Sequence, residues 1–329
     1  MGAGDLEPAL SEALPRRLLV AGGAGFIGSA FVRLLLGENR GLAVTVLDKL
    51  TYAGNLENLE PVQDQPGFRF VKGDICDAAL VGELAGGVDC IVNFAAETHV
   101  DRSILDPGSF IRTDVEGTHQ LLEAARLAQH QRFLQVSTDE VYGDVPAPER
   151  SRESDPLRPR SPYSASKASG DLLCLAYHAT YGVPVVLTRG SNTYGPYQYP
   201  EKIVPLFITQ ALEQLPLPLY GDGSAVRDYL HVDDHARGIA TVLARGTPGE
   251  AYNLGRGDRP ISGIEVATTI LRLTGQDPAL IQPVLDRPGH DRRYALDSSR
   301  AEALGWSSSL GFEEGMARTV RWYQERRDW

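Results

Sequence analysis

The sequence predicts an α/β fold, in which a doubly wound parallel sheet is accompanied by a smaller C-terminal domain. Short apolar segments of strand length alternate with longer segments whose apolar residues follow helical spacing, which is typical of parallel sheets with crossover helices. Three glycines spaced three residues apart separate the first strand from the first helix. At 329 residues the chain exceeds one typical domain and can bury a sizeable core.

The predicted elements begin at residue 17, with a strand at 17–21 and a helix at 26–36. Further strands are predicted at 43–47, 68–72, 90–94 and 132–136, and two longer helices at 107–129 and 162–181. The segments around 231–234 and 252–254 resemble elements that return to the larger domain, so the two domains are interleaved. We expect a sheet domain at 16–188 with 230–260, a smaller domain at 189–229 with 261–329, and a flexible tail at 1–15.

The composition limits the class of protein. The chain has 32 basic and 43 acidic residues and a net charge of −11, which argues against nucleic acid or an anionic membrane as the main partner. The three cysteines, Cys76, Cys90 and Cys174, have no metal-ligand spacing, and an odd number gives no disulfide framework. We therefore expect no metal site and a reducing, cytoplasmic setting. No secretory signal and no apolar stretch of about 20 residues occurs.

The glycines are Gly22, Gly25 and Gly28, in a G-x-x-G-x-x-G spacing between strand and helix. Glycine permits a sharp turn and lets backbone N–H groups approach a pyrophosphate, which the helix N-terminus also attracts. A glycine turn can equally be structural. Asp48, which closes the second strand twenty positions after Gly28, supports the dinucleotide interpretation, because its carboxylate can accept hydrogen bonds from a ribose. The same carboxylate would repel a 2′-phosphate, so NAD is favoured over NADP. Together with the glycine turn, this indicates that the sheet is a Rossmann domain.

Two further strand ends carry candidate cofactor contacts. Asp74 follows the third strand and could face an adenine, although an Asp there is about as often a helix cap. Ala95 and Ala96 follow the fourth strand and are small enough to admit a cofactor closely, but tight packing explains them equally well.

The candidate reacting groups follow the strand at 132–136. Thr138, Asp139 and Glu140 emerge where that strand ends, and the carboxyl ends of parallel strands line the ligand crevice. Both carboxylates can enter one cavity only if the chain leaves the extended conformation, so we place them in a loop. Tyr163 and Lys167 lie four apart on one helical face after Pro162. We expect the lysine to lower the pKa of the phenol and make it a usable base.

The glycine turn, Asp48 and the Tyr163/Lys167 pair resemble the extended short-chain dehydrogenase/reductase superfamily. Within it, the chain is similar to the dTDP-glucose 4,6-dehydratase family over roughly residues 17–325. The similarity lies in the segments 48–55, 95–103, 137–143, 195–197, 200–202, 227–228 and 286–294.

The resemblance implies an internal redox cycle on dTDP-glucose, in which NAD⁺ is used and restored within one turnover. Tyr163 would remove the 4-hydroxyl proton while hydride leaves C4, with Thr138 hydrogen-bonded to the same oxygen. Glu140 would take the C5 proton, and a protonated Asp139 would donate to the departing 6-hydroxyl. Adjacent carboxylates with partial burial can have pKa values far enough apart for these two roles.

The resemblance also implies a set of binding residues and a homodimer formed through a helix bundle. With the motifs above, the predicted cofactor contacts are Gly22, Gly25, Phe26, Ile27, Gly28, Asp48, Lys49, Leu50, Thr51, Gly54, Asp74, Ile75, Ala95, Ala96, Thr113, Tyr163 and Lys167. The predicted nucleotide-sugar contacts, from the smaller domain and the strand ends, are His99, Thr138, Asn192, Lys202, Ile203, Pro218, Tyr220, Arg227, Arg287 and His290. Arginine suits diphosphate recognition because it can donate two parallel hydrogen bonds.

Three residues depart from the family pattern. Ala21 stands where a threonine often precedes the glycine turn, Thr193 replaces an asparagine, and Arg256 replaces a glycine. None of them removes a proposed reacting group, but Thr193 and Arg256 leave the choice of dTDP over another nucleotide open.

Other functions share part of this pattern. A nucleotide-sugar 4-epimerase would use NAD, Tyr163 and Lys167 without needing an acid and a base at C5 and C6, and a UDP-glucuronate decarboxylase would carry a small polar residue in place of Asp139. A catalytically silent NAD-responsive binding protein is a third alternative, against which the complete set of reacting groups argues.

Overall fold

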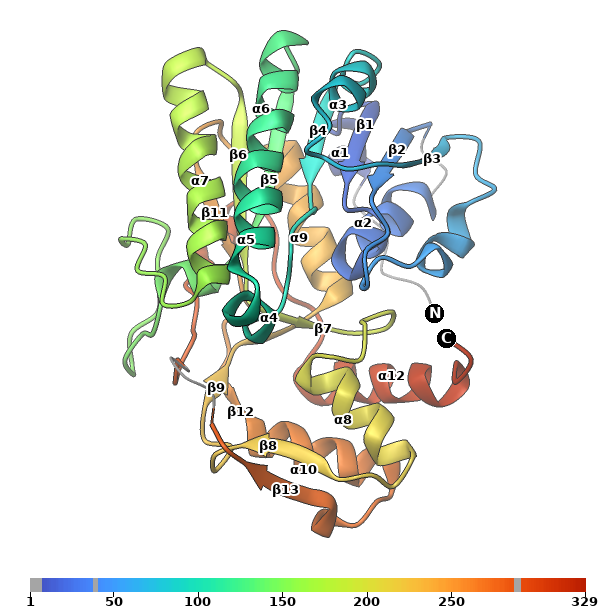
Figure 1. Cartoon of the computed structure of the whole chain (residues 1–329), viewed down its shortest axis with the longest axis vertical. Coiled ribbons are helices and arrows are strands. Elements are labelled where there is room, and N and C mark those ends of the chain that lie inside the picture. The colour runs from blue at the N-terminus through green and yellow to red at the C-terminus, as the bar shows by residue number, and fades with distance from the viewer. Residues whose placement is uncertain (1–7, 38–40, 287–290) are drawn as a thin grey trace.

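The structure, a computed structural model, describes residues 8–37, 41–286 and 291–329. Seven parallel strands form one sheet in the order β11-β6-β5-β4-β1-β2-β3 (Figure 1). In that order they are Ala251–Leu254, Val185–Gly190, Arg132–Thr138, Cys90–Asn93, Arg17–Ala21, Ala43–Asp48 and Phe68–Lys72. The strand order reverses between β1 and β4, and ligands bind at such a reversal in open α/β sheets. The predicted doubly wound parallel sheet is confirmed.

Helices cover both faces of the sheet, each over its own hydrophobic cluster. One face carries α1 (Pro8–Glu12), α2 (Phe26–Gly37) and α9 (Val232–Arg245). The other carries α3 (Ala78–Ala85), α6 (Thr118–Leu127) and α7 (Pro162–Tyr181). Between strands and helices lie η1 (Leu56–Val62), α4 (Val100–Leu105), α5 (Pro107–Phe110), the π-helical η2 (Ile111–Gly117) and the 3₁₀ turn η3 (Asp139–Tyr142).

The smaller part of the molecule lies below the carboxyl edge of the sheet in Figure 1 and has its own core. Its helices are α8 (Ile203–Leu212), α10 (Gly263–Thr274) and α12 (Phe312–Glu325). Three two-stranded pairs accompany them: β8 (Leu217–Tyr220) with β13 (Ile281–Val284), β9 (Val226–Arg227) with β12 (Ile261–Ser262), and β7 (Asn192–Tyr194) with β10 (Tyr229–His231). The remaining short helices are η4 (Pro278–Leu280) and α11 (Ser299–Ala303).

Local sequence explains the start and end of α7, the helix that carries Tyr163 and Lys167. Ser161 is the N-cap and exchanges hydrogen bonds with Ser164 in a capping box, while Pro162 occupies the first turn, where its missing N–H costs nothing. The helix ends at Gly182, which adopts the left-handed conformation with φ of 71° that favours glycine. The N-cap therefore fixes where α7 begins, and with it the position of Tyr163 in the first turn of the helix.

The prediction of a flexible tail over residues 1–15 is wrong for residues 8–15. Helix α1 begins this stretch, and Leu10 within it and Leu14 after it bury their side chains in the cluster shared by α2 and α9. A single helical turn with two buried leucines gives too short a pattern to be read from sequence. Residues 1–7 lie outside the described part of the chain.

The chain returns to the sheet late in the sequence. Strand β11 and helix α9 both lie within the stretch 230–260. Strand β11 pairs with β6, and α9 packs against α2. Helix α11 contacts β11 and α9, and the Trp306 indole nitrogen donates to the Asp234 carbonyl at 3.0 Å. We therefore propose that residues 299–306 belong with the larger domain, although the sequence placed them within 261–329.

Candidate active site

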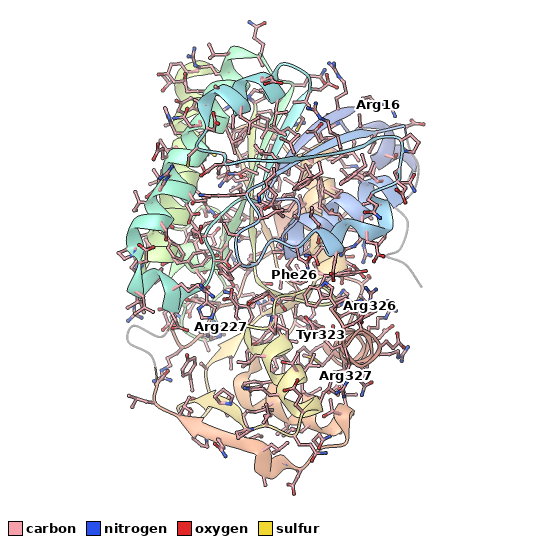
Figure 2. All side chains as sticks on the ribbon, turned by 45° about the vertical axis from the view of Figure 1, so that its right-hand side comes forward. Arg16, Phe26, Arg227, Tyr323, Arg326 and Arg327 are labelled. Carbon is pink, nitrogen blue, oxygen red and sulfur yellow. The ribbon has the colours of Figure 1, made fainter. Side chains whose placement is uncertain are left out.

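A cavity of about 600 Å³ lies between the carboxyl edge of the sheet and the smaller part of the molecule. Phe26 at the start of α2 and Arg227 of β9 both line it, and Figure 2 shows them where the two parts meet. The ends of β1, β2, β4 and β5 contribute one wall, and α8, β8 and β9 contribute the opposite wall. The cavity is large enough to hold a ligand of substantial size.

The cavity brings together almost all predicted site residues. The five predicted reacting residues line it, as do the predicted cofactor contacts other than Leu50. Of the predicted sugar-nucleotide contacts, those that line it are His99, Thr138, Asn192, Lys202, Ile203, Pro218, Tyr220 and Arg227. Arg287 and His290 lie outside the described residues. The predicted roles of all these site residues in binding and catalysis remain proposals.

Leu50 is placed differently from the prediction. Its backbone N–H donates to Asp48 Oδ1 at 2.8 Å, and its side chain packs against the hydrophobic core instead of lining the cavity. Leu50 therefore acts on this site by holding Asp48.

The glycine turn is shaped by close backbone contacts. Gly22 has φ of 75°, and a Cβ atom there would lie 2.5 Å from the Ala95 nitrogen. A Cβ atom on Gly28 would lie 2.3 Å from the Gly22 carbonyl oxygen, whereas on Gly25 its nearest neighbour would be 3.3 Å away. Gly22 and Gly28 are thus required by packing, which supports the structural interpretation, and contact of this turn with a pyrophosphate stays a prediction.

Asp48 fastens this turn to the end of β2. Its Oδ2 accepts from the Ala24 N–H at 2.9 Å, opposite the bond that Oδ1 accepts from Leu50. Burial raises the pKa of Asp48, and the two backbone N–H donors oppose that rise. Asp74 forms an ion pair with Lys49 at 2.7 Å, while Asp77 and not Asp74 caps α3. The helix-cap alternative for Asp74 is therefore wrong.

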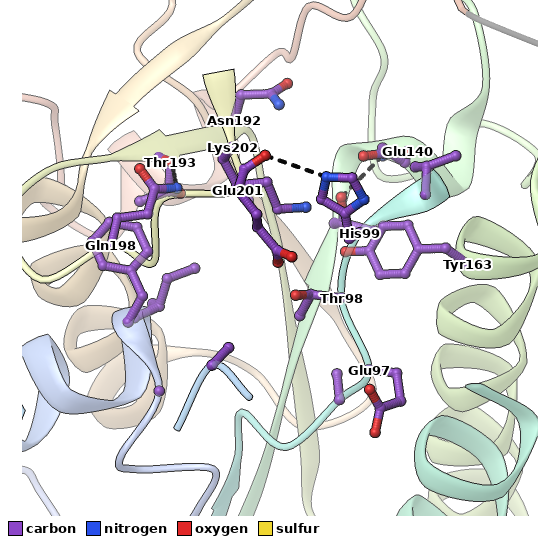
Figure 3. A pocket seen from close by; sticks show the side chains of 18 of the residues that line it. Glu97, Thr98, His99, Glu140, Tyr163, Asn192, Thr193, Gln198, Glu201 and Lys202 are labelled. Carbon is purple, nitrogen blue, oxygen red and sulfur yellow. Dashed lines mark hydrogen bonds between the residues drawn. The ribbon is translucent and has the colours of Figure 1, made fainter. Parts of the chain in front are cut away.

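The two carboxylates that follow β5 differ in environment. Asp139 is only 3% exposed, and Thr138 Oγ1 donates to its Oδ1 at 3.2 Å. Burial, together with the neighbouring charge of Glu140, raises the pKa of Asp139 well above its usual range. Burial therefore favours the neutral, protonated form of this carboxyl group. The Thr138 hydroxyl accepts from the Glu140 N–H at 3.3 Å and caps η3, so the expected loop is a tight 3₁₀ turn (Figure 3).

The expected effect of Lys167 on Tyr163 is not what the structure shows. Burial raises the pKa of Tyr163 well above 10, and the nearby carboxylates of Glu140 and Asp114 add to the rise, while a hydrogen bond with Thr138 opposes it. The Lys167 ammonium donates to the Val136 carbonyl at 2.8 Å, inside the protein. Desolvation and the neighbouring carboxylates therefore raise the pKa of the phenol in this structure, and the lowering effect expected of Lys167 stays a prediction.

A buried network holds η3 against the sheet. The Arg189 guanidinium donates from Nε to Asp171 at 2.9 Å and from Nη1 to the Tyr142 hydroxyl at 2.8 Å. Tyr142 in turn donates to Asn253 Oδ1 at 2.8 Å. The network joins α7, β6, β11 and the turn that carries Asp139, so it fixes that turn relative to the helix that carries Tyr163.

On the opposite wall, Arg227 is held by backbone acceptors. Its Nη1 and Nη2 donate to the carbonyls of Val226 and Asp291, both at 2.8 Å, and its guanidinium lies over the Tyr294 ring. Tyr220 is 41% exposed and its hydroxyl donates to Asp101 at 3.4 Å. Both side chains are therefore positioned before a ligand arrives.

Sequence reasoning missed a bridge across the cavity. Tyr52 donates to Glu201 Oε1 at 3.0 Å, and Arg102 donates to Glu201 Oε2 at 3.2 Å. Figure 3 shows Glu201 beside His99, whose ring contacts the Glu201 carbonyl oxygen. All three bridge residues lie in segments that carried the family resemblance, but nothing in their spacing indicates that they meet.

Sequence reasoning also gave Asp114 no role. It is a buried carboxyl group on η2, and a polar residue on the buried face of the helix predicted at 107–129 was the signal available.

Three cysteines are free, and the described residues contain no group of three or more His, Cys, Asp or Glu side chains able to hold a metal ion.

The fold and this cavity define an NAD-dependent enzyme of the extended short-chain dehydrogenase/reductase type. The family model described as GDP-mannose 4,6 dehydratase matches residues 19–319. A dTDP-glucose 4,6-dehydratase from Streptomyces niveus is 50% identical over 95% of this chain and 94% of that protein. The chain therefore belongs to the dTDP-glucose 4,6-dehydratase family.

Solved structures agree with this assignment. DesIV, a dTDP-glucose 4,6-dehydratase from Streptomyces venezuelae with NAD bound, matches with a TM-score of 0.92 and 52% identity, covering 95% of this chain and 98% of that chain. A UDP-glucose 4-epimerase from Thermus thermophilus with NAD matches with a TM-score of 0.87 and 35% identity, covering 94% of this chain and 99% of that chain. The fold is thus shared with epimerases.

The geometry of the glycine turn generates a prediction. We expect Gly22→Ala to destabilise the protein by at least about 2 kcal/mol, because the new Cβ meets backbone and the left-handed φ is unfavourable for alanine. NAD affinity should fall as well, measured by isothermal titration calorimetry alongside urea unfolding. The matched control is Gly82→Ala within α3, where a Cβ meets nothing within 4 Å. This control should gain about 0.5–1 kcal/mol from helix propensity. Equal behaviour of the two variants would contradict the packing argument.

Proposed function

We propose that the protein converts dTDP-glucose to dTDP-4-keto-6-deoxyglucose and water, acting as an NAD-dependent hydro-lyase. The observation that carries this proposal is the burial of Asp139, which raises the pKa of its carboxyl group, next to Glu140 and within the same cavity as Tyr163. A 4-epimerase needs only the tyrosine, whereas loss of water across C5 and C6 needs an acid and a base in addition.

The cofactor side of the cavity suits NAD. Gly25 leaves backbone open at the start of α2, and Asp48 lies at the end of β2 with its carboxylate lining the cavity. The buried side-chain oxygens of Ser137, Ser191 and Asn192 have no hydrogen-bond partner among the described residues, and all three residues line the cavity. In this cavity, bound NAD would supply the acceptor for hydride from C4 of the sugar and the donor of hydride to C6.

The side chains of this protein move the protons. Tyr163 takes the proton of the 4-hydroxyl, with Thr138 beside it to hydrogen-bond the same oxygen, and the 4-ketone that forms acidifies the C5 proton. Glu140 removes that proton, and Asp139 donates its own to the 6-hydroxyl, which leaves as water. Glu140 then returns a proton to C5 as hydride reaches C6, and the proton gained by Tyr163 restores Asp139. The product differs from the substrate by one water, and no net oxidation occurs.

The substrate assignment can be tested directly. The purified protein should convert dTDP-glucose to a product lighter by one water, as measured by mass spectrometry, with no net accumulation of NADH. UDP-glucose assayed in parallel measures how strictly the nucleotide is selected. Unchanged substrate, or a product of unchanged mass with an inverted C4, would contradict the proposed function.

The two carboxyl groups should fail in different ways. Glu140→Gln should abolish exchange of the C5 proton with deuterated solvent and lower kcat by about 10²–10⁴, because the base is lost. Asp139→Asn should retain C5 exchange but slow the release of water by a similar factor. Product NMR in deuterium oxide separates the two steps, with the exposed Glu149→Gln as a control that keeps full activity. The role assignment fails if both variants turn over normally or if their effects are reversed.

We also propose a homodimer, which the family resemblance suggests. Large apolar side chains are exposed on neighbouring helices of one layer: Ile104 and Leu105 on α4, Ile111 on η2, Leu127 on α6, and Leu172 and Tyr181 on α7. A second copy of the chain would cover this surface. We further propose a reducing, cytoplasmic setting, which the three free cysteines support. The described residues contain no helix long and apolar enough to cross a membrane.

Light scattering tests the dimer. The native protein should have twice the mass of one chain, and Leu172→Asp should shift it toward a monomer because a charge is placed in the proposed interface. Leu215→Asp is the matched control, since Leu215 is exposed in the smaller part of the molecule and should leave the mass unchanged. A monomeric native protein, or a dimer insensitive to Leu172→Asp but disrupted by Leu215→Asp, would contradict this interface.

A further inference from the structure

A carboxyl group that the reaction does not use directly lies next to the reacting tyrosine's helix. Asp114 sits on the π-helical segment η2 and is 2% exposed. Its Oδ2 accepts from the Ser166 hydroxyl at 2.6 Å, and its Oδ1 accepts from the Glu97 backbone N–H at 3.0 Å. Asp114 therefore joins α7 to the loop after β4, two of the segments that line the cavity.

Asp114 is linked to Tyr163 by hydrogen bonding and by charge. The Ser166 hydroxyl oxygen lies 2.8 Å from the Tyr163 carbonyl oxygen and 2.6 Å from Asp114 Oδ2. This one hydroxyl therefore connects Asp114 with the first turn of α7. Ser166 precedes Lys167, whose positive charge stabilises the Asp114 carboxylate. The negative charge of Asp114 raises the pKa of Tyr163 and so disfavours its phenolate form.

The other charged groups around these two residues are few. Asp114 faces Lys167 of α7 and Glu97 of the loop after β4, and Tyr163 faces Glu140 and Asp139 of η3. Burial raises the pKa of Asp114 to about 6, with Lys167 and the Ser166 hydroxyl opposing the rise. At pH values above about 6 the group is therefore mostly a carboxylate, and its charge then acts on Tyr163.

We propose that Asp114 is a positioning residue whose negative charge sets the pH above which Tyr163 can accept the C4 hydroxyl proton. The inference rests on the proposed function, because it concerns the first proton transfer of that reaction. Like charges in a desolvated site repel, so a phenolate beside the Asp114 carboxylate forms only at higher pH than it would beside a neutral group. The same carboxylate anchors Ser166 and Glu97 by hydrogen bonds that a neutral amide could also make.

Asp114→Asn separates charge from shape. The amide oxygen can accept from the Glu97 N–H, and the amide nitrogen can donate to Ser166 Oγ, whose own proton remains free for the Tyr163 carbonyl. The variant therefore removes the charge and retains the connection. We expect the acid limb of kcat/KM for dTDP-glucose to move to lower pH by about one unit, which is about a tenfold gain in rate on that limb.

Thermal unfolding supplies a second readout. Because the pKa of Asp114 is raised by folding, its ionisation destabilises the folded state above about pH 6, and this penalty disappears as the pH falls toward the ordinary Asp value. Asp114→Asn should therefore raise Tm at pH 8 and have little effect near pH 4. Glu116→Gln, an exposed carboxylate on the same helical segment, is the matched control and should leave both the pH profile and Tm unchanged.

The outcomes are distinct. An active wild-type enzyme whose acid limb is unshifted, or shifted to higher pH, by Asp114→Asn overturns this inference and leaves the proposed function standing. An equal shift in Glu116→Gln also overturns it, because net charge alone would then be responsible. Absence of dehydration by the wild-type enzyme at every pH overturns the proposed function and this inference together.

Discussion

The chemistry of this site depends on the removal of one carboxyl group from water. Asp139 is buried next to Glu140, and two neighbouring carboxyl groups in a desolvated site cannot both be ionised at neutral pH without a large cost. Burial favours the proton on Asp139, the more buried of the two, and in the proposed mechanism this difference supplies an acid and a base from adjacent residues. Burial also raises the pKa of Tyr163, so in the proposed reaction its phenolate form needs a nearby positive charge. An oxidised nicotinamide ring carries one.

The rest of the fold keeps these groups in place. Parallel strands bring their carboxyl ends to one edge, so Thr138 at the end of β5 lines the same cavity as the glycine turn after β1 and Asp48 at the end of β2. The buried Arg189 network then ties the turn after β5 to α7 and β11. Burying an ion pair is weak evidence of stability, but breaking one is costly, so such a network suits a site that requires fixed geometry. The smaller domain completes the cavity with Arg227, already oriented by backbone carbonyls.

Much of this arrangement could be predicted from the sequence. The strands, the glycine turn and Asp48 are local patterns, and the family resemblance placed nearly every site residue in the cavity that the structure contains. What could not be predicted depends on contacts between distant segments. Leu50 packs its side chain against the core while its backbone N–H donates to Asp48, Leu10 and Leu14 are buried against distant helices, and the Lys167 ammonium donates to the Val136 carbonyl. The bridge of Tyr52 and Arg102 to Glu201 joins residues about one hundred or more positions apart, which no local pattern indicates.

The protonation of Asp139 is the claim on which the mechanism rests most directly, and infrared spectroscopy can observe it. A protonated carboxyl group gives a carbonyl stretch well separated from carboxylate bands, and the Asp139→Asn variant identifies which band belongs to this residue. At neutral pH, the account predicts a protonated-carboxyl band in the wild-type enzyme that is missing from the variant. Identical spectra in the protonated-carboxyl region, with only carboxylate bands lost on substitution, would show that Asp139 is ionised and would contradict its role as the acid.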